Sequence, residues 1–313
     1  MTATNETDDG SSPIAAEDLR RLQQRSDARG LLRLAGHLGL MFGTGWLYAI
    51  APPLLVLPAA VVYGFTLVTM FAAMHESIHA TAFKTRWIND TVGWFAGLLS
   101  FYNSTFYRKY HWWHHRFTQL RGKDPELDDP RPTSLSTYAL ELSGAYWWSG
   151  KLKTYVAIVR GRVSDYPFID EVARPSVVRS VRLQLATYGA AIALSVVAGH
   201  PWFLVYWLLP VAAAQPFLRA FLLAEHTGCS EDADAMTNTR TTWTIWPVRF
   251  LMWEMPYHAE HHRYPALPFF ALAAAHASLE PRLTHVARSG YLGVHAELLR
   301  TLPKRPPPIE RPV

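Results

Sequence analysis

Two long stretches of the sequence contain no charged residue. Lys, Arg, Asp and Glu are absent from residues 34–74 and again from residues 183–218. A helix crosses the apolar part of a bilayer with about 20 residues, so each stretch is long enough for two crossings joined by a tight turn. Turn-forming residues lie where the two turns are needed, at Pro52-Pro53 and at Gly199-His200-Pro201. We therefore expect two membrane hairpins, with crossings at about 34–50, 54–74, 183–199 and 202–223.

The alternative is a set of buried core helices in a soluble protein, and the composition speaks against it. Charged residues make up 18% of the chain, against about a quarter in soluble domains. Lys and Arg flank both charge-free stretches and are absent from both predicted hairpin tips. Because positive residues tend to stay on the cytoplasmic side, we expect both termini and the residues flanking the hairpins to be cytoplasmic.

The remaining segments predict one membrane domain, residues 18–302, with a polar segment at each end. Residues 1–17 are expected to form a disordered lead, and residues 303–313 are too rich in Pro to form a packed element. We expect residues 88–102 to form a short helix at the membrane interface, and residues 137–165 to form interfacial helices with Trp147 and Trp148 at head-group depth. No signal peptide is expected, and the single cysteine, Cys229, excludes an internal disulfide.

Histidines are concentrated in three short boxes. The first is His75-Glu-Ser-Ile-His79, the second is His111-Trp-Trp-His-His115, and the third is His258-Ala-Glu-His-His262. On a helix, residues three and four apart lie on one face, so each box presents its imidazoles together. Imidazole is the commonest neutral metal ligand. If helices on one side of the membrane bring the boxes together, the set suits two metal ions with four or five ligands each.

The residues alone leave the metal and the protein class open. An all-imidazole site suits iron, copper, zinc or nickel, whereas the lack of thiolates excludes iron–sulfur and zinc-finger chemistry. A membrane protein that only binds or transports metal is one alternative, but transport favours ligands inside the crossings, and the boxes lie at or beyond their ends. A haem protein is less consistent with the pattern, because it uses isolated axial histidines rather than adjacent pairs.

The three boxes resemble those of the integral-membrane fatty acid desaturase family. The continuation His262-Arg-Tyr-Pro-Ala-Leu-Pro268 is similar to the ending of the third box in the acyl-lipid and carotenoid-modifying branches, and the resemblance covers residues 34–280. It implies an all-α membrane protein with four transmembrane helices and a cytoplasmic histidine-rich cap that holds two iron ions (Fe²⁺). In the family a histidine after the fourth crossing completes the ligand set, and His226 has that place. The implied metal ligands are His75, His79, His111, His114, His115, His226, His258, His261 and His262.

Acids and tryptophans close to the boxes in sequence are further candidate site residues. Four acids lie close to the boxes in sequence and are candidates to accept hydrogen bonds from ligating imidazoles: Glu76, Asp90, Glu225 and Glu260. Three tryptophans are candidates to line an apolar substrate channel: Trp112, Trp113 and Trp253. Some family members have a side-chain amide one turn before the position of His226, where this sequence has Leu222.

The resemblance implies an oxygen-dependent oxidoreductase that introduces a double bond into a lipid acyl chain, with dioxygen as co-substrate. A hydroxylase or carotenoid-type oxygenase would use the same ligands and is the alternative; a non-catalytic metal-binding membrane protein is a third. Electrons would come from an external donor: a ferredoxin, a Rieske-type protein or cytochrome b5, with a reductase. The donor could dock on the basic residues around the boxes, although these also suit lipid head groups: Lys84, Arg86, Arg108, Lys109, Arg116 and Arg121. No nucleic-acid partner is expected.

Overall fold

The first charge-free stretch forms a helical hairpin in the computed structural model, which describes residues 13–128 and 131–302. Helix α2 (Asp27–Ala49) is followed by Pro52, and the chain restarts as a 3₁₀ turn, η1 (Pro53–Leu55), with Pro at its first position. A proline lacks the N–H that a helix interior needs but fits the first turn, so the two prolines set the turn. Helices α3 (Val56–Val68) and α4 (Met70–Ile78) return along α2.

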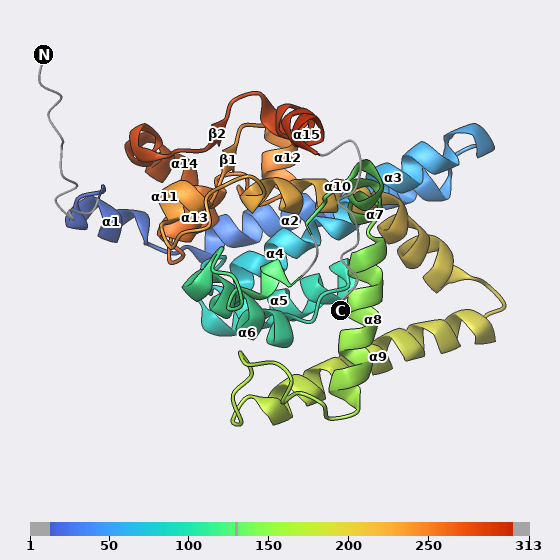
Figure 1. Ribbon diagram of the computed structural model, residues 1–313. Helices are drawn as coiled ribbons and strands as arrows, with labels where there is room; N and C mark the ends of the chain where they lie inside the picture. The colour runs from blue at the N-terminus through green and yellow to red at the C-terminus, as the bar shows by residue number, and fades with distance from the viewer. Residues whose placement is uncertain (1–12, 129–130, 303–313) are drawn as a thin grey trace, which may run out of the picture.

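The second stretch forms a second hairpin of the same kind. Helix α9 (Arg174–Val197) ends before Gly199, whose positive φ of 67° makes the turn. The return begins with a π-helical turn, η3 (Leu204–Leu208), and continues as α10 (Leu209–His226). The π-helical turn ends two residues before Pro210, which has no N–H for the usual helical bond. Figure 1 shows the turns of both hairpins at the right-hand end of the molecule, with α6 and α13 toward the other end.

Within residues 13–128 and 131–302, three helical segments are long and apolar enough to cross a membrane: Pro53–Ile78, Arg174–Val197 and Leu204–His226. Four crossings were expected, and α2 is not among the three, because Arg33, His37 and four glycines lower the mean hydropathy of its last 18 residues. Large apolar side chains on both hairpins are nevertheless exposed, as Leu54 (89%) and Val197 (86%) illustrate. Exposed apolar surface of this extent is typical of contact with lipid. The chain is a mostly helical membrane protein.

Two helices between the hairpins carry the second box and its support. Helix α5 (Arg86–Ser100) covers the helix predicted at 88–102 and packs along α4. Helix α6 (Ser104–Phe117) begins after Asn103, whose side chain accepts a hydrogen bond from the backbone N–H of Phe106. This is the usual capping role of Asn. The cap fixes where the helix starts, and therefore the direction in which its histidines point.

The segment 137–165, predicted to be helical, is helical only as far as Val159, and residues 160–165 lie in turns and loop. A 3₁₀ turn, η2 (Pro125–Leu127), leads toward α7 (Leu135–Leu142) and α8 (Ala145–Val159), and α8 packs on α9. Trp147 was predicted at head-group depth as an interfacial residue, but its side chain does not face the surroundings of the protein. Its ring is buried in the protein core, and its Nε1–H donates to the Tyr102 hydroxyl at 3.0 Å.

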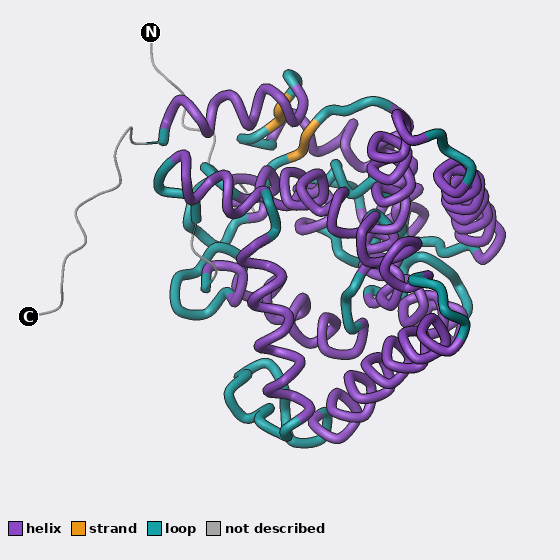
Figure 2. Tube along the Cα trace, turned by 90° about the vertical axis from the view of Figure 1, so that its right-hand side faces the viewer, coloured by secondary structure: helices purple, strands orange, loops and turns teal. Residues whose placement is uncertain are grey.

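The C-terminal part covers the ends of the hairpin helices with short elements. They are α11 (Ala235–Asn238), β1 (Thr241–Thr242), α12 (Trp246–Leu251), α13 (His258–Arg263), α14 (Phe269–Leu279), η4 (Glu280–Arg282), β2 (Val286–Ala287) and α15 (Gly290–Thr301). The strands pair in parallel, with Thr241 opposite Val286, and are the two orange segments of Figure 2. Helix α1 (Ala16–Leu22) packs on α14. The predicted tail, and residues 1–12 of the predicted lead, lie outside the described residues.

Candidate metal centre

The histidines of the three boxes meet at one end of the hairpins. Five of them form a cluster in which the ligand nitrogens all lie within 4.8 Å of one another: His75, His79, His111, His115 and His261. A second cluster, with the same limit, contains His114, His226 and His262. His258 lies beside this second cluster, with its Nε2 atom 3.2 Å from the Nε2 atom of His226. The clusters adjoin, since the rings of His115 and His262 stack with centroids 4.2 Å apart.

The spacing of the second and third boxes divides each box between the two clusters. On α6, His111 and His115 belong to the first cluster and the intervening His114 to the second. On α13 the arrangement is reversed, because His261 belongs to the first cluster while His262 belongs to the second. Residues four apart point the same way along a helix, and a residue between them points to one side. Each short helix therefore contributes to two adjacent sites.

The ring nitrogens are arranged as a metal ion requires. In the first cluster, the Nε2 atoms of His75 and His111 are 2.8 Å apart, and those of His115 and His261 are 3.0 Å apart. The Nε2 atoms of His79, His114 and His262 are buried without any hydrogen-bond partner among the described residues. Buried polar atoms without partners are costly, and a cation bound between them would remove that cost. The donor set thus fits two metal ions.

Burial keeps most of these imidazoles in the form that binds metal. It lowers the pKa of His111, His115 and His262 well below the usual value, and the neighbouring imidazoles lower these pKa values further. For His261, burial followed by the charge of His114 lowers the pKa to about 3. These rings are therefore neutral near pH 7, and a neutral imidazole keeps a lone pair for a metal.

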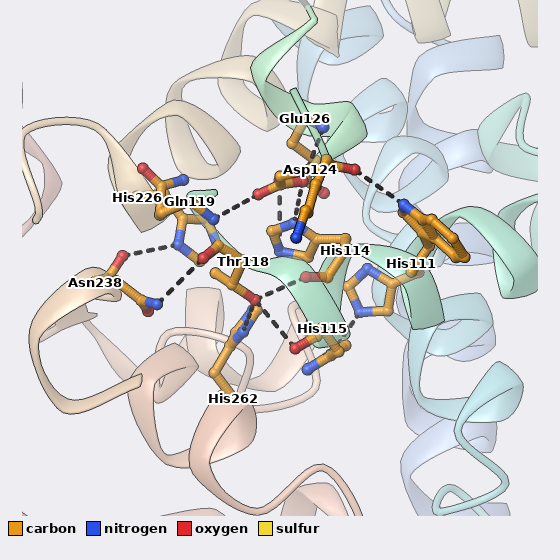
Figure 3. A network of polar contacts seen from close by, with 12 residues as sticks. His111, His114, His115, Thr118, Gln119, Asp124, Glu126, His226, Asn238 and His262 are labelled. Carbon is orange, nitrogen blue, oxygen red and sulfur yellow. Dashed lines mark hydrogen bonds and ion pairs between the residues drawn. The ribbon is translucent and has the colours of Figure 1, made fainter. Parts of the chain in front are cut away.

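His114 differs because a carboxylate holds its other nitrogen. The Nδ1 atom of His114 lies 2.9 Å from Oδ1 of the buried Asp124. Burial acts to lower the pKa of His114, but Glu126 and Asp124 together raise it. Backbone N–H groups of Gln119 and Glu126 also donate to the Asp124 carboxylate and fix it in place (Figure 3). Such a carboxylate fixes the tautomer of a ligating histidine, so that Nε2 faces the metal.

The role of Asp124 was missed in the sequence, where Gly122-Lys-Asp-Pro-Glu indicated only the end of a helix. A single signal could have suggested it: an acid nine residues after the second box, directly followed by a proline. Thr118 was also missed; its hydroxyl is 3.3 Å from Nδ1 of His262. Nδ1 of His226 is 3.1 Å from the backbone carbonyl oxygen of Asn238. Figure 3 shows Thr118 between His262 and the loop that carries Asn238.

The four acids predicted beside the boxes have different surroundings. Oε1 of Glu76 is 3.9 Å from Nδ1 of His75, and Oε2 of Glu225 is 3.4 Å from Nε2 of His258. Glu260 bonds instead to His276, outside the clusters. The prediction for Asp90 is wrong. Its carboxylate is partly exposed at the surface and pairs with Arg86, one turn earlier on α5, and with Arg108.

The three tryptophans predicted to line a channel do not line the cavity beside the clusters. Trp112 is 59% exposed, Trp113 donates to the carbonyl oxygen of Lys123, and Trp253 is fully buried with its N–H donating to His37. That cavity has a volume of about 350 Å³, and its lining includes His111, His226 and His258. Its apolar and aromatic lining comes from Phe71, Tyr102, Phe106, Tyr107, Tyr110, Tyr146, Trp147, Leu222, Leu223 and Met255, among others.

The comparison with known proteins agrees with the histidine pattern. The sequence pattern of the family described as fatty acid desaturase matches residues 51–289, more than half of the chain. The chain belongs to the fatty acid desaturase family. The resemblance drawn from the three boxes is therefore confirmed, and the hairpins, boxes and cavity can be considered as parts of a desaturase-type protein.

Curated relatives within the family are distant in sequence and similar in extent. An sn-1 oleoyl-lipid 12-desaturase of Picosynechococcus sp. is 26% identical over 254 residues, which span 75% of this chain and 72% of the relative. The corresponding enzyme of Synechocystis sp. is 23% identical over 256 residues, with 75% and 72% covered. A sphingolipid delta(4)-desaturase DES1-like protein of Oryza sativa is 26% identical over 250 residues, with 77% and 70% covered. These names support a desaturase-type activity on lipids.

Proposed function

We propose that the chain is an oxygen-dependent oxidoreductase that introduces a double bond into an acyl chain at a pair of iron ions. The observation that carries the proposal is the meeting of nine buried or nearly buried imidazoles in two adjoining sets beside a cavity. One ion would be held by His75, His79, His111, His115 and His261. The other would be held by His114, His226, His258 and His262. Iron bound there would activate dioxygen, the oxidant, for the removal of hydrogen from an unactivated C–H bond.

The residues of the chain bind and orient the substrate and keep water away. Phe71, Tyr102 and Tyr107 place aromatic surface along the cavity, next to His111. Apolar walls favour the hydrocarbon part of a substrate, and a substrate held against His226 and His258 has one C–H bond close to the metal ligands. Asp124 holds His114 in the tautomer that leaves Nε2 for the metal.

The proposal includes a membrane topology with four crossings and cytoplasmic termini. Helix α2 would be the remaining crossing, since it packs on α3 and exposes Leu32 (76%) and Phe42 (70%). Arg20, Arg21 and Arg25 precede it, as the positive-inside rule predicts for a cytoplasmic start. On that topology the histidine clusters face the cytoplasm, where a ferredoxin, a Rieske-type protein or cytochrome b5 with its reductase would supply electrons.

The first test is the lipid profile of a heterologous host that expresses the chain with a ferredoxin and its reductase. We expect a product lighter than an existing lipid by two hydrogen atoms, and none in cells that express His261→Ala. A product heavier by one oxygen atom would assign the chain as a hydroxylase. If iron-loaded protein with a reducing donor produces neither product from any lipid or free fatty acid supplied, the proposal fails.

A further inference from the structure

The cavity beside the histidine clusters has charged groups in its wall as well as aromatic ones. Its lining includes basic and acidic side chains from α7, α8, α10 and the segment after α6: Glu126, Asp128, Arg131, Glu141, Lys151, Arg219 and Glu225. An acyl chain has no polar atoms, so a cavity made only for such a chain would gain nothing from charge in its wall. The wall is suited to a ligand that has a polar group as well as a hydrocarbon part.

Arg219 is the group in this wall that most clearly lacks a partner of opposite charge. It lies on α10 within a candidate membrane span and is 8% exposed. Its Nη2 donates to the Tyr102 hydroxyl at 2.6 Å, and its guanidinium carbon is 5.2 Å from the Trp147 ring centroid. Its Nε atom is buried without a partner, and no described carboxylate lies within ion-pair distance of the side chain.

Another arginine of the same protein shows what a purely structural role looks like. Arg33 is also largely buried, and its guanidinium pairs with Glu254 at 3.2 Å and donates to the carbonyl oxygen of Phe250 at 2.8 Å. A buried cation is ordinarily stabilised by such an acceptor set, because burying an unpaired charge is costly. Arg33 also lies over two phenylalanine rings, so the difference is the carboxylate: Arg219 has a tyrosine hydroxyl and one tryptophan ring but no paired carboxylate among the described residues, and it lines a cavity.

Tyr102 adds a second donor at the same place. Its hydroxyl oxygen accepts hydrogen bonds from Arg219 and from Trp147, at 2.6 and 3.0 Å. A tyrosine hydroxyl that accepts two bonds still has its own proton to donate. Lys151 lies over the Tyr102 ring, with its Nζ atom 3.9 Å from the centroid, which adds positive charge to this part of the cavity. Arg219 and Tyr102 thus place two hydrogen-bond donors side by side in the wall of the cavity.

We propose that Arg219 and Tyr102 bind an anionic oxygen group of the substrate, such as a carboxylate, while the carbon to be oxidised lies at the His226 and His258 end. The position of the oxidised carbon near His226 and His258 rests on the proposed function, whereas the binding of the anionic group does not. Arg219 and His226 are seven residues apart on one helix, so the two ends are separated by about 10 Å at a rise of about 1.5 Å per residue. The substrate class is a short carboxylate-bearing amphiphile rather than a neutral membrane lipid.

The experiment compares two probes of equal length on the full-length protein in nanodiscs, decanoate and 1-decanol. Binding is measured by isothermal titration at pH 8, without turnover. We expect the wild type to bind decanoate about tenfold or more tightly than decanol, since a charge-assisted hydrogen bond is lost with the alcohol. Arg219→Gln should remove this difference by weakening decanoate binding alone, and Arg219→Lys should retain part of it.

Arg182→Gln is the matched control, because Arg182 also lies on a candidate membrane helix but donates to the carbonyl oxygen of Val159 and does not line this cavity. Equal affinity of the wild type for acid and alcohol would overturn the proposal, and this comparison needs no variant to fold. An equal loss of affinity for both probes in a folded Arg219→Gln protein would also overturn it, because it would show that Arg219 only supports the packing of the cavity. Because binding is measured without oxygen or electrons, these outcomes stay separate from a failure of the oxidation itself.

Discussion

At the scale of single residues, the ligand histidines were visible in the sequence, whereas the groups that orient them were not. The boxes have a spacing with few structural uses, so His111, His114 and His115 could be singled out directly. Asp124 reaches His114 only because the loop after α6 turns back on the helix, and no local pattern specifies that turn. The tryptophans of the second box follow His111 at positions i+1 and i+2. On a helix such neighbours point away from one another, which explains why Trp112 is exposed instead of lining the cavity.

The contact between Asp124 and His114 leads to a prediction for a conservative change. Asp124→Asn keeps the size of the side chain and removes its charge, so His114 loses the group that fixes its tautomer. We expect the affinity for metal and the turnover rate each to fall about 10- to 100-fold, and the metal content of the purified protein to fall with them. Metal analysis and oxygen consumption measure both quantities. The control is Asp90→Asn, an exposed acid that pairs with Arg86 and Arg108, which should leave both unchanged. Wild-type metal content and rate in Asp124→Asn would contradict the assignment.

At the scale of helices, charge patterning located the hairpins but not the full length of their helices. Helix α9 starts at Arg174, nine residues before the predicted crossing at 183, because a helix can continue through charged residues on the water side of a membrane. The shape of the contact between helices was not predictable either. A Cβ atom on Gly64 would lie 1.9 Å from the carbonyl oxygen of Pro210, so α3 and α10 touch backbone to backbone there.

That contact makes Gly64 intolerant of even one methyl group. Gly64→Ala forces α3 away from α10, and overpacking of this kind costs about 1–3 kcal/mol or more. We expect a lower melting temperature in detergent and a reduced yield of monodisperse protein. Gly39→Ala on α2 is the matched control, because nothing lies within 4 Å of its added Cβ atom. Since Ala favours a helix over Gly, the control should melt at the wild-type temperature or above. An unchanged melting temperature in Gly64→Ala would mean that this contact is absent.

At the scale of the whole molecule, the two clusters join segments that are far apart in sequence. Ligands come from α4 and the residue after it, α6, α10 and α13, so bound metal would link both hairpins to the C-terminal part. Removing metal with a chelator should lower the melting temperature by about 10 °C, as expected for the loss of a tight ligand in a protein of this size. Differential scanning fluorimetry before and after chelation measures the change, and added Fe²⁺ should restore it. The double variant His261→Ala/His262→Ala should melt at one temperature with or without chelator; a full shift in this variant would point to metal bound elsewhere.

The division of the ligands of α6 and α13 between the two clusters has a consequence for the order in which metal ions bind. Because each of these helices supplies ligands to both clusters, an ion that orders one cluster also positions the side chains of the other. The second ion should therefore bind more tightly than the first. During a stepwise titration with Fe²⁺ we expect native mass spectrometry to show empty and doubly occupied protein, with little of the singly occupied form. Loading would be an all-or-none event, and partly assembled enzyme would be rare even when iron is scarce.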